Sequence, residues 1–157
     1  MAASSGVSKG GLLHHYPTKE ALLKGIVQHL IDAFDQRLAT VLANEDPAGA
    51  DGATGRWLRA YVMACFAADI SDDRLIAALG ASVNGHPQLL DSLRTSLDEA
   101  QALALTDGLP PARATAIRLA CDGLWLGELA GMSALAEPLR SQLRDELLAL
   151  TRSAKQH

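Results

Sequence analysis

The side chains that could perform catalysis in this sequence are few and widely separated. Its five histidines show no spacing typical of metal ligands. No H-E-x-x-H, C-x-x-C, phosphate-binding loop or nucleophile elbow is present. His14 and His15 are adjacent, so on a helix they would point about 100° apart. We therefore predict neither an enzyme nor a bound cofactor or metal. The simplest interpretation of His14 and His15 is that both side chains are exposed to solvent.

The two cysteines, Cys65 and Cys121, lie inside apolar helical patterns. We interpret them as buried thiols in a reducing cytoplasm. The longest apolar segment, 114–136, carries Arg118, Asp122 and Glu128, and no uncharged run reaches the ~20 residues that a membrane span requires. We expect a cytoplasmic protein that does not bind a membrane.

The elements that must position these residues are predicted to be helices. Hydrophobic residues make up 48% of the chain and aromatic residues 4%, a mixture rich in Ala and Leu that favours helices over strands. Apolar residues recur at steps of three and four from Leu23 to Val41, which indicates one long helix capped by Thr18. The fold is predicted to be all-α, with about seven or eight helices: 8–15, 18–41, 58–70, 71–83, 87–106, 111–135 and 138–150.

The charge is distributed unevenly along the chain. The net charge is −4, but residues 1–30 contain three lysines and one glutamate, which gives this segment a charge of +2. A polyanion would therefore meet the N-terminal end.

The stretch GVSKGGLLHHYPTKEALL, residues 6–23, predicts a short helix joined by a tight turn to the long one. Val7 and Leu12 would face inward. Ser8, Lys9 and the two glycines that follow would leave an outer face with little bulk, which could approach a DNA groove closely.

This stretch resembles the recognition helix and following turn of the TetR family of bacterial one-component regulators. The family pattern runs roughly Gly-Val-Ser-x-x-x-Leu-Tyr-x-x-Phe-x-Ser-Lys-Glu-x-Leu. The matching positions are Gly6, Val7, Ser8, Leu12, Lys19, Glu20 and Leu22, with Tyr16 and Thr18 as conservative replacements.

The resemblance implies two parts of the chain with different roles. Residues 1–17 would be the remnant of a helix-turn-helix DNA-binding domain, with its recognition helix at about 8–15. Residues 18–157 would form a helical ligand-binding and dimerisation domain. The residues that would contact operator DNA, by carry-over from the family, are Ser8, Lys9, Gly10, Gly11, His14, His15 and Lys19.

The same resemblance leads us to expect truncation, because the family's DNA-binding unit has three helices and most of the first two should precede Gly6. We expect this chain to be impaired in DNA binding. The implied function is that of a regulator, a repressor by family habit, which binds a palindromic operator as a homodimer. The alternative is a stand-alone ligand-binding and dimerisation module that does not bind DNA.

Three glycines, Gly123, Gly127 and Gly131, are spaced four apart in the segment 111–135. Each costs a helix roughly 1 kcal/mol relative to alanine, so their register suggests close helix–helix approach. By resemblance to the family, 111–152 would be the dimer element, although tight packing within one subunit would explain the glycines as well. The predicted interface residues are Gly123, Gly127, Gly131, Leu139, Leu143 and Leu147.

An effector pocket is expected among the middle helices, 55–105, closed by the long helix and by 111–135. Its ligand should be a small and mostly apolar molecule. Asp122 and Glu128 could mark a polar spot, or could be interface groups paired with Arg118 or Arg140. The candidate lining residues, which could equally be ordinary core, are Trp57, Tyr61, Met63, Phe66, His86 and Trp125.

Overall fold

The computed structural model describes residues 16–45, 53–67, 87–129 and 135–152. Helices dominate these ranges, and no β-strand occurs in them, which confirms the all-α prediction. The elements are α2 (Lys19–Asn44), α3 (Arg56–Phe66), the short 3₁₀ helix η1 (Pro87–Leu90), α5 (Asp91–Thr106), α6 (Pro111–Leu129) and α7 (Leu139–Leu150).

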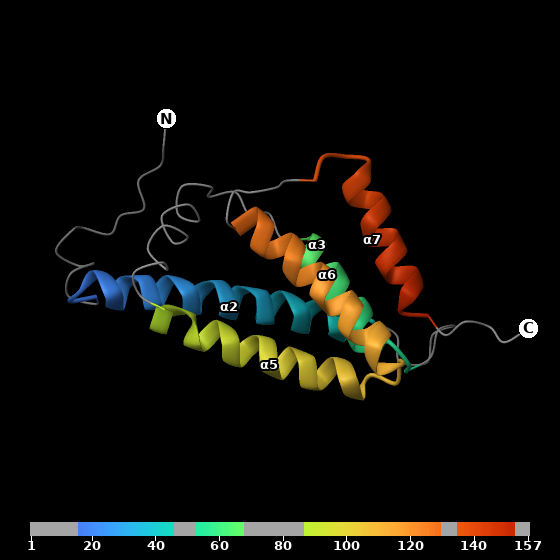
Figure 1. Cartoon of the computed structure of the whole chain (residues 1–157), viewed down its shortest axis with the longest axis horizontal. Coiled ribbons are helices and arrows are strands. Elements are labelled where there is room, and N and C mark those ends of the chain that lie inside the picture. Colours follow the sequence, from blue (N-terminus) through green and yellow to red (C-terminus); the bar gives the residue numbers. More distant parts are fainter. Residues whose placement is uncertain (1–15, 46–52, 68–86, 130–134, 153–157) are drawn as a thin grey trace, which may run out of the picture.

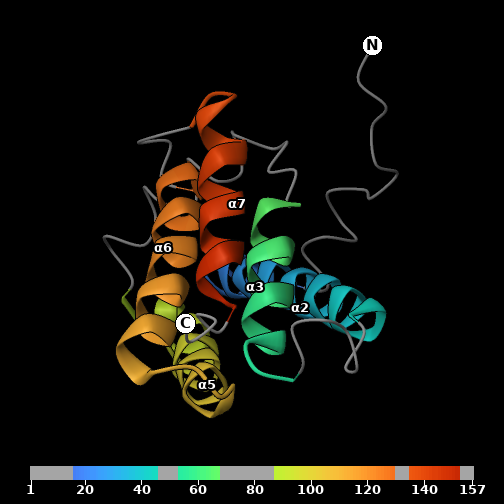
Figure 2. The same ribbon diagram turned by 90° about the vertical axis from the view of Figure 1, so that its right-hand side faces the viewer.

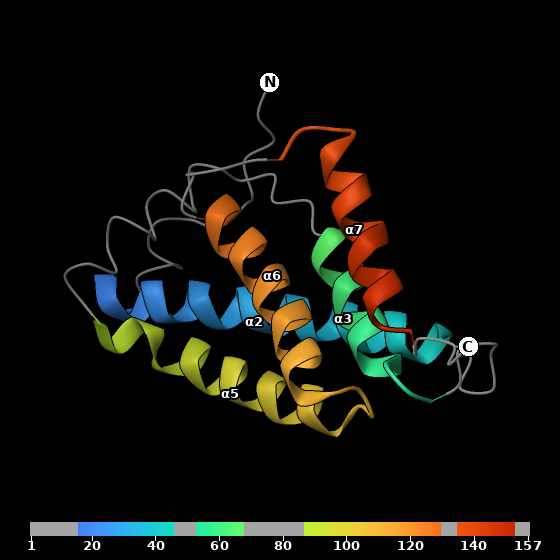
Figure 3. The ribbon, with the colours of Figure 1, turned by 45° about the vertical axis from the view of Figure 1, so that its right-hand side comes forward.

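The helices form two groups that cross each other. Helices α2 and α5 lie side by side, and α6 begins near the end of α5 and passes across α2 in this view (Figure 1). Helices α3, α6 and α7 stand next to one another in the other group (Figure 2). In the intermediate view α3 lies between α6 and α7 (Figure 3). The space among α2, α3, α5 and α6 is therefore bounded by helices from both groups.

Helix α2 begins where the sequence predicts. The Thr18 hydroxyl accepts a hydrogen bond from the backbone N–H of Ala21 at 3.0 Å, and Glu20 lies in the first turn, where the helix dipole favours an acid. The buried face starts at Leu23 and Val27. The predicted cap and apolar stripe of the long helix are confirmed.

The other helix boundaries agree with the predictions to within a few residues. Helix α5 stops at Thr106, directly before Asp107-Gly108, and α7 begins directly after Pro138. One boundary was wrong, because Leu135 is not helical and α6 is described to Leu129. The predicted helices at 8–15 and 71–83 lie outside the described residues.

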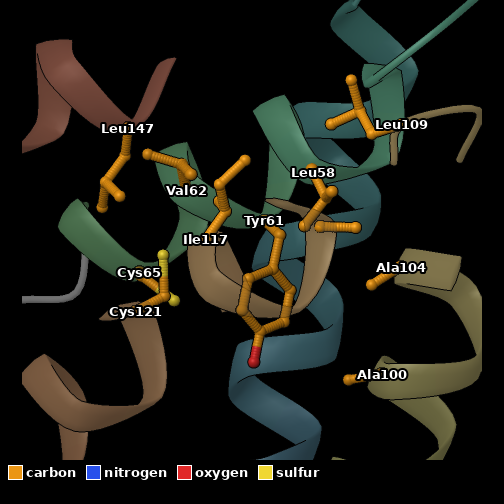
Figure 4. Packing of buried hydrophobic residues seen from close by; sticks show 11 residues of the cluster. Leu58, Tyr61, Val62, Cys65, Ala100, Ala104, Leu109, Ile117, Cys121 and Leu147 are labelled. Carbon is orange, nitrogen blue, oxygen red and sulfur yellow. The ribbon is translucent and has the colours of Figure 1, made fainter. Parts of the chain in front are cut away.

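The main core gathers side chains from α3, α5, α6 and α7 (Figure 4). Leu58, Val62 and Ile117 are fully buried at its centre, and the sulfur atoms of Cys65 and Cys121 lie next to each other there. The prediction that both cysteines are buried is confirmed, and both are free thiols. Among the described helices, none is long and apolar enough to cross a membrane.

Candidate ligand cavity and exposed helix face

A chain of polar side chains crosses the otherwise apolar core. The Tyr61 hydroxyl on α3 donates a hydrogen bond to Oδ1 of Asp122 on α6 at 2.6 Å. The other carboxylate oxygen of Asp122 accepts from the Arg118 guanidinium one turn earlier. Arg118 Nε donates to Gln101 Oε1 on α5 at 2.6 Å, and Gln101 Nε2 donates to the Thr115 hydroxyl at 2.9 Å. This network links α3, α5 and α6 and satisfies a buried carboxylate.

The charge state of this network follows from its burial. Desolvation raises the pKa of Asp122 above its usual value, while the hydrogen bond from Tyr61 and the charge of Arg118 act in the opposite direction. Burial, together with Cys65 and Asp122 nearby, raises the pKa of Tyr61, so the phenol remains a neutral donor. The sequence left two interpretations of Asp122 open, a polar spot or an interface group paired with an arginine. The structure shows a buried polar spot in which Arg118 of the same protomer is the partner.

Aromatic rings lie beside this network. The Trp57 and Tyr61 rings are stacked, with centroids 4.9 Å apart and planes 28° apart. The Phe34 ring from α2 meets Tyr61 edge-on at 5.2 Å. Each stacked or edge-to-face pair contributes about 1 kcal/mol of stability beyond the contribution of its buried area. They fix one wall of the space between α2 and α3.

An apolar cavity of about 100 Å³ opens beside these rings, between α2, α3, α5 and α6. Leu30, Leu38, Leu93, Leu97 and Ala100 supply much of its wall. Its walls come from four helices, as expected for a ligand pocket of a helical domain. The polar residues that line it are Asp35, Ser96, Glu99, Asp122 and the hydroxyl-bearing Tyr61.

Two exposed carboxylates, Asp35 on α2 and Glu99 on α5, lie among the residues that line the cavity. They are close enough to interact. The pKa of Asp35 is raised by partial burial first, and then by the charges of Asp32 and Glu99. Within the described residues, neither Asp35 nor Glu99 forms a salt bridge.

Three of the predicted lining residues, Trp57, Tyr61 and Trp125, line this cavity. Met63 and Phe66 do not, since their positions on α3 place them elsewhere. Met63 is 38% exposed, and Phe66 packs against the core with the Arg140 guanidinium 5.2 Å from its ring. The remaining candidate, His86, lies outside the described residues. The cavity thus supports part of the predicted set.

The contributions of α2 and α5 to the cavity were not predicted residue by residue. Phe34 and Leu38 belong to the apolar stripe of the long helix, which the sequence placed against the pocket as a whole. The sequence feature that could have pointed to the cavity is an acid, Asp35, next to that stripe. In the structure Asp35 lies near Glu99 of α5. Predicting that Asp35 and Glu99 lie close together requires the register between α2 and α5, and the periodicity of one helix does not provide this register.

One face of α6 is exposed, uncharged and formed by small or apolar residues. Its members recur at alternating steps of four and three, as in a helix that packs against another helix. Leu119 is 53% exposed and Leu126 is 39% exposed. A Cβ atom at Gly123 would have no neighbour within 4 Å, so packing inside the protomer does not require glycine there. The face comprises Ala112, Ala116, Leu119, Gly123 and Leu126, and we call it the α6 face.

The predicted dimer residues are distributed over different environments. Gly123 lies on the α6 face, and Leu139 at the start of α7 is 54% exposed. Gly123, Gly127 and Leu143 all line a hollow of about 180 Å³ whose walls come from α6, α7 and Leu135. Leu147 is 5% exposed and belongs to the core of its own protomer. Gly131 lies outside the described residues.

Glu128 on α6 forms an ion pair with Arg140 on α7. Both side chains are largely buried, so the pair joins the two helices within one protomer. From the sequence, Arg140 was one of two arginines considered as a partner if Glu128 were an interface group.

The predicted DNA-contacting residues fall mostly outside the described residues. Those are Ser8, Lys9, Gly10, Gly11, His14 and His15. Lys19 is described, and it is the exposed first residue of α2.

The fold and the cavity together define an all-helical domain with an internal apolar site and an uncovered helix face. A family model for the tetracyclin repressor-like C-terminal domain matches residues 55–152. The chain therefore belongs to the TetR family, as its N-terminal stretch indicated. Neither the curated proteins nor the solved structures gave a match to the chain. The matched region runs from the start of α3 to the end of α7 and includes three of the four walls of the cavity.

Proposed function

We propose that this protein is a TetR-like transcriptional repressor that binds operator DNA as a homodimer and is released by a small, mostly apolar effector. The observation that carries this proposal is the cavity among α2, α3, α5 and α6. A ligand there would contact Trp57 and Tyr61 on α3 and Phe34 on α2 at the same time. Because α2 is also the helix that carries Lys19 at its first position, a shift of α2 would couple the cavity to the DNA-binding end.

The α6 face supports the homodimer. Exposed leucines on either side of an unobstructed glycine allow a second α6 to approach closely. A symmetric pair would bury the same face of both chains, as in most homodimers. A dimer would also present two DNA-reading elements to the two halves of a palindrome.

Ligand binding to the cavity can be measured with the neutral fluorescent probe N-phenyl-1-naphthylamine. We expect the full chain to bind it, and Ala100→Phe and Ser96→Phe to weaken binding at least roughly tenfold, because both changes fill the cavity. The matched control is Ala102→Phe, an exposed position on the same helix outside the cavity. Circular dichroism checks the fold of each variant. Equal affinity for the wild type and both filled variants would contradict a ligand site here.

Self-association is tested by sedimentation velocity. Gly123→Leu should shift the protein from dimer to monomer, because the new side chain would project from the α6 face into the partner. The protomer itself should tolerate it, since a Cβ atom there meets nothing within 4 Å. Ala102→Leu on α5 is the control. A Gly123→Leu protein that remains dimeric would place the interface elsewhere.

DNA binding is tested by selecting sites from random DNA with the full chain. We expect a palindromic consensus that this chain binds weakly, and Lys19→Ala should lower affinity for all sequences further and reduce the salt dependence. Lys24→Ala, one turn further along α2, is the matched control because Lys24 already pairs with Glu20. Failure to recover any enriched sequence would favour a ligand-binding and dimerisation module instead.

A further inference from the structure

The cavity has a strongly one-sided charge distribution. Its lining includes three carboxylates, Asp35, Glu99 and Asp122, and none of the described residues that line it is Lys, Arg or His. Asp122 is already neutralised by the buried Arg118 guanidinium, which lies against the other side of the carboxylate. Asp35 and Glu99 have no such partner among the described residues. Two carboxylates therefore face the cavity without compensation.

The two carboxylates favour a positively charged ligand, and the aromatic residues of the cavity do so as well. Among the described residues, four aromatic side chains line it: Phe34, Trp57, Tyr61 and Trp125. The face of an aromatic ring attracts a cation, and tryptophan attracts it most strongly. Aliphatic side chains, among them Leu30, Leu38 and Leu97, supply further apolar wall that a ligand body could contact. Carboxylates beside aromatic walls are a combination suited to an organic cation with an apolar body.

We propose that the effector is an amphipathic organic cation, an amine or quaternary ammonium compound whose apolar part occupies the cavity and whose charge lies between Asp35 and Glu99. This inference rests on the proposed function, because it specifies the ligand of the same cavity. A bound cation would relieve the repulsion between the two carboxylates, whereas a bound anion would add to it. Partial burial first, and then the charges of Asp32 and Glu99, raise the pKa of Asp35.

A neutral ligand would use the apolar walls but leave the two carboxylates unpaired. An inorganic divalent cation would use the carboxylates but leave the apolar volume empty. Hard cations also prefer six or more oxygen ligands, and this rim offers two carboxylates that face each other from different helices. An organic cation uses both features, and for this reason we favour it.

The test compares two molecules of nearly the same size and shape. Phenyltrimethylammonium carries a positive charge, and tert-butylbenzene is its neutral isostere. Binding to the full chain can be followed through the fluorescence of Trp57 and Trp125, the two tryptophans of the chain, both of which line the cavity. We expect the cation to bind roughly tenfold more tightly than the isostere, from the combined effect of ring faces and rim carboxylates.

Variants then test whether the preference for the cation comes from Asp35 and Glu99, the two carboxylates that we call the rim. Asp35→Asn and Glu99→Gln keep the shape of each side chain, and each should weaken binding of the cation roughly fivefold without changing that of tert-butylbenzene. Asp98→Asn is the matched control, because Asp98 is exposed on α5 and does not line the cavity. Raising the salt concentration should weaken the binding of phenyltrimethylammonium but leave the binding of tert-butylbenzene unchanged.

The outcomes separate this inference from the proposed function. Equal binding of both probes, unaffected by Asp35→Asn and Glu99→Gln, would overturn the cation preference and leave the cavity as a site for neutral ligands. Binding of neither probe, together with no binding of N-phenyl-1-naphthylamine, would overturn both proposals. Equal losses for the cation in Asp98→Asn and Asp35→Asn would attribute the effect to net charge and also overturn the assignment to the rim.

Discussion

The Tyr61 hydroxyl on α3 and the Asp122 carboxylate on α6 are joined by a 2.6 Å hydrogen bond in the interior of the domain. Tyr61 is 4% exposed and Asp122 is 7% exposed. The same tyrosine ring forms part of the cavity wall and stacks on Trp57. This bond therefore connects the packing of two helices to the shape of the ligand site.

Tyr61→Phe should lower the free energy of unfolding by about 1–3 kcal/mol at neutral pH, because a buried carboxylate loses one of its donors. The loss should be smaller at acidic pH. The pKa of Asp122 is already raised by burial, and removing the Tyr61 donor raises it further. Asp122 would then be protonated at acidic pH, where the missing donor costs less. Urea unfolding at both pH values measures the difference.

Tyr16→Phe is the matched control for this experiment. Tyr16 packs against Gly25, and its hydroxyl forms no hydrogen bond within the described residues. We expect a change below about 0.5 kcal/mol at either pH. A Tyr61→Phe protein as stable as this control would show that water or Arg118 replaces the lost donor.

Two described glycines have a positive φ angle, Gly55 before α3 and Gly108 after α5, and they differ in the space around them. Gly55 has a φ of 71°, and a Cβ atom there would lie 2.1 Å from the carbonyl oxygen of Thr151. Gly55→Ala should therefore destabilise the domain by at least about 2 kcal/mol. At Gly108, φ is 81°, but the nearest atom to a Cβ would be the flexible Thr54 hydroxyl at 3.3 Å. Gly108→Ala should cost about 1–2 kcal/mol from backbone strain alone.

Thermal unfolding of the two glycine variants separates strain from steric overlap. We expect the lower melting temperature for Gly55→Ala. The opposite order, or equal values, would mean that the contact between the α3 start and the end of α7 relaxes without cost.

Much of the fold was predictable because it depends on local signals. The Thr18 cap, the apolar stripe that follows it and the stop before Asp107-Gly108 are each encoded within a few residues. Asp122 and Glu128 were interpreted from the sequence either as a polar spot or as interface groups paired with Arg118 or Arg140. The structure shows both ion pairs inside one protomer.

The candidate site was less predictable, because it depends on distances between helices. Met63 and Trp57 are both large apolar residues of α3, but only Trp57 faces the cavity. Leu147 has the same sequence pattern as Leu139, although the first is core and the second is exposed. The side of a helix that meets another element is decided by the crossing angles of its neighbours, and sequence periodicity does not contain them.

The carboxylate of Asp107, which follows α5, caps the start of α3. Its two oxygens accept from the backbone N–H groups of Trp57 at 3.0 Å and Leu58 at 2.8 Å. Asp107→Ala should reduce the free energy of unfolding by about 1–2 kcal/mol, since two amides of the first turn lose their acceptors. Asp107→Asn keeps one acceptor oxygen and should lose less. Equal losses in both variants would assign the effect to charge rather than to capping, as urea unfolding would reveal.

The two thiols should be inert in the folded protein. Cys65 is 5% exposed and Cys121 is fully buried, and the contact with Cys121 together with burial raises the pKa of the Cys65 thiol. Modification by 5,5′-dithiobis(2-nitrobenzoic acid) at neutral pH should be roughly a thousandfold slower than for a free thiol, and both groups should react in guanidinium. Ala102→Cys, which adds an exposed thiol on α5, provides the fast reference. Rapid reaction of either native thiol would show that the α3–α6 contact opens frequently, and the cavity wall with it.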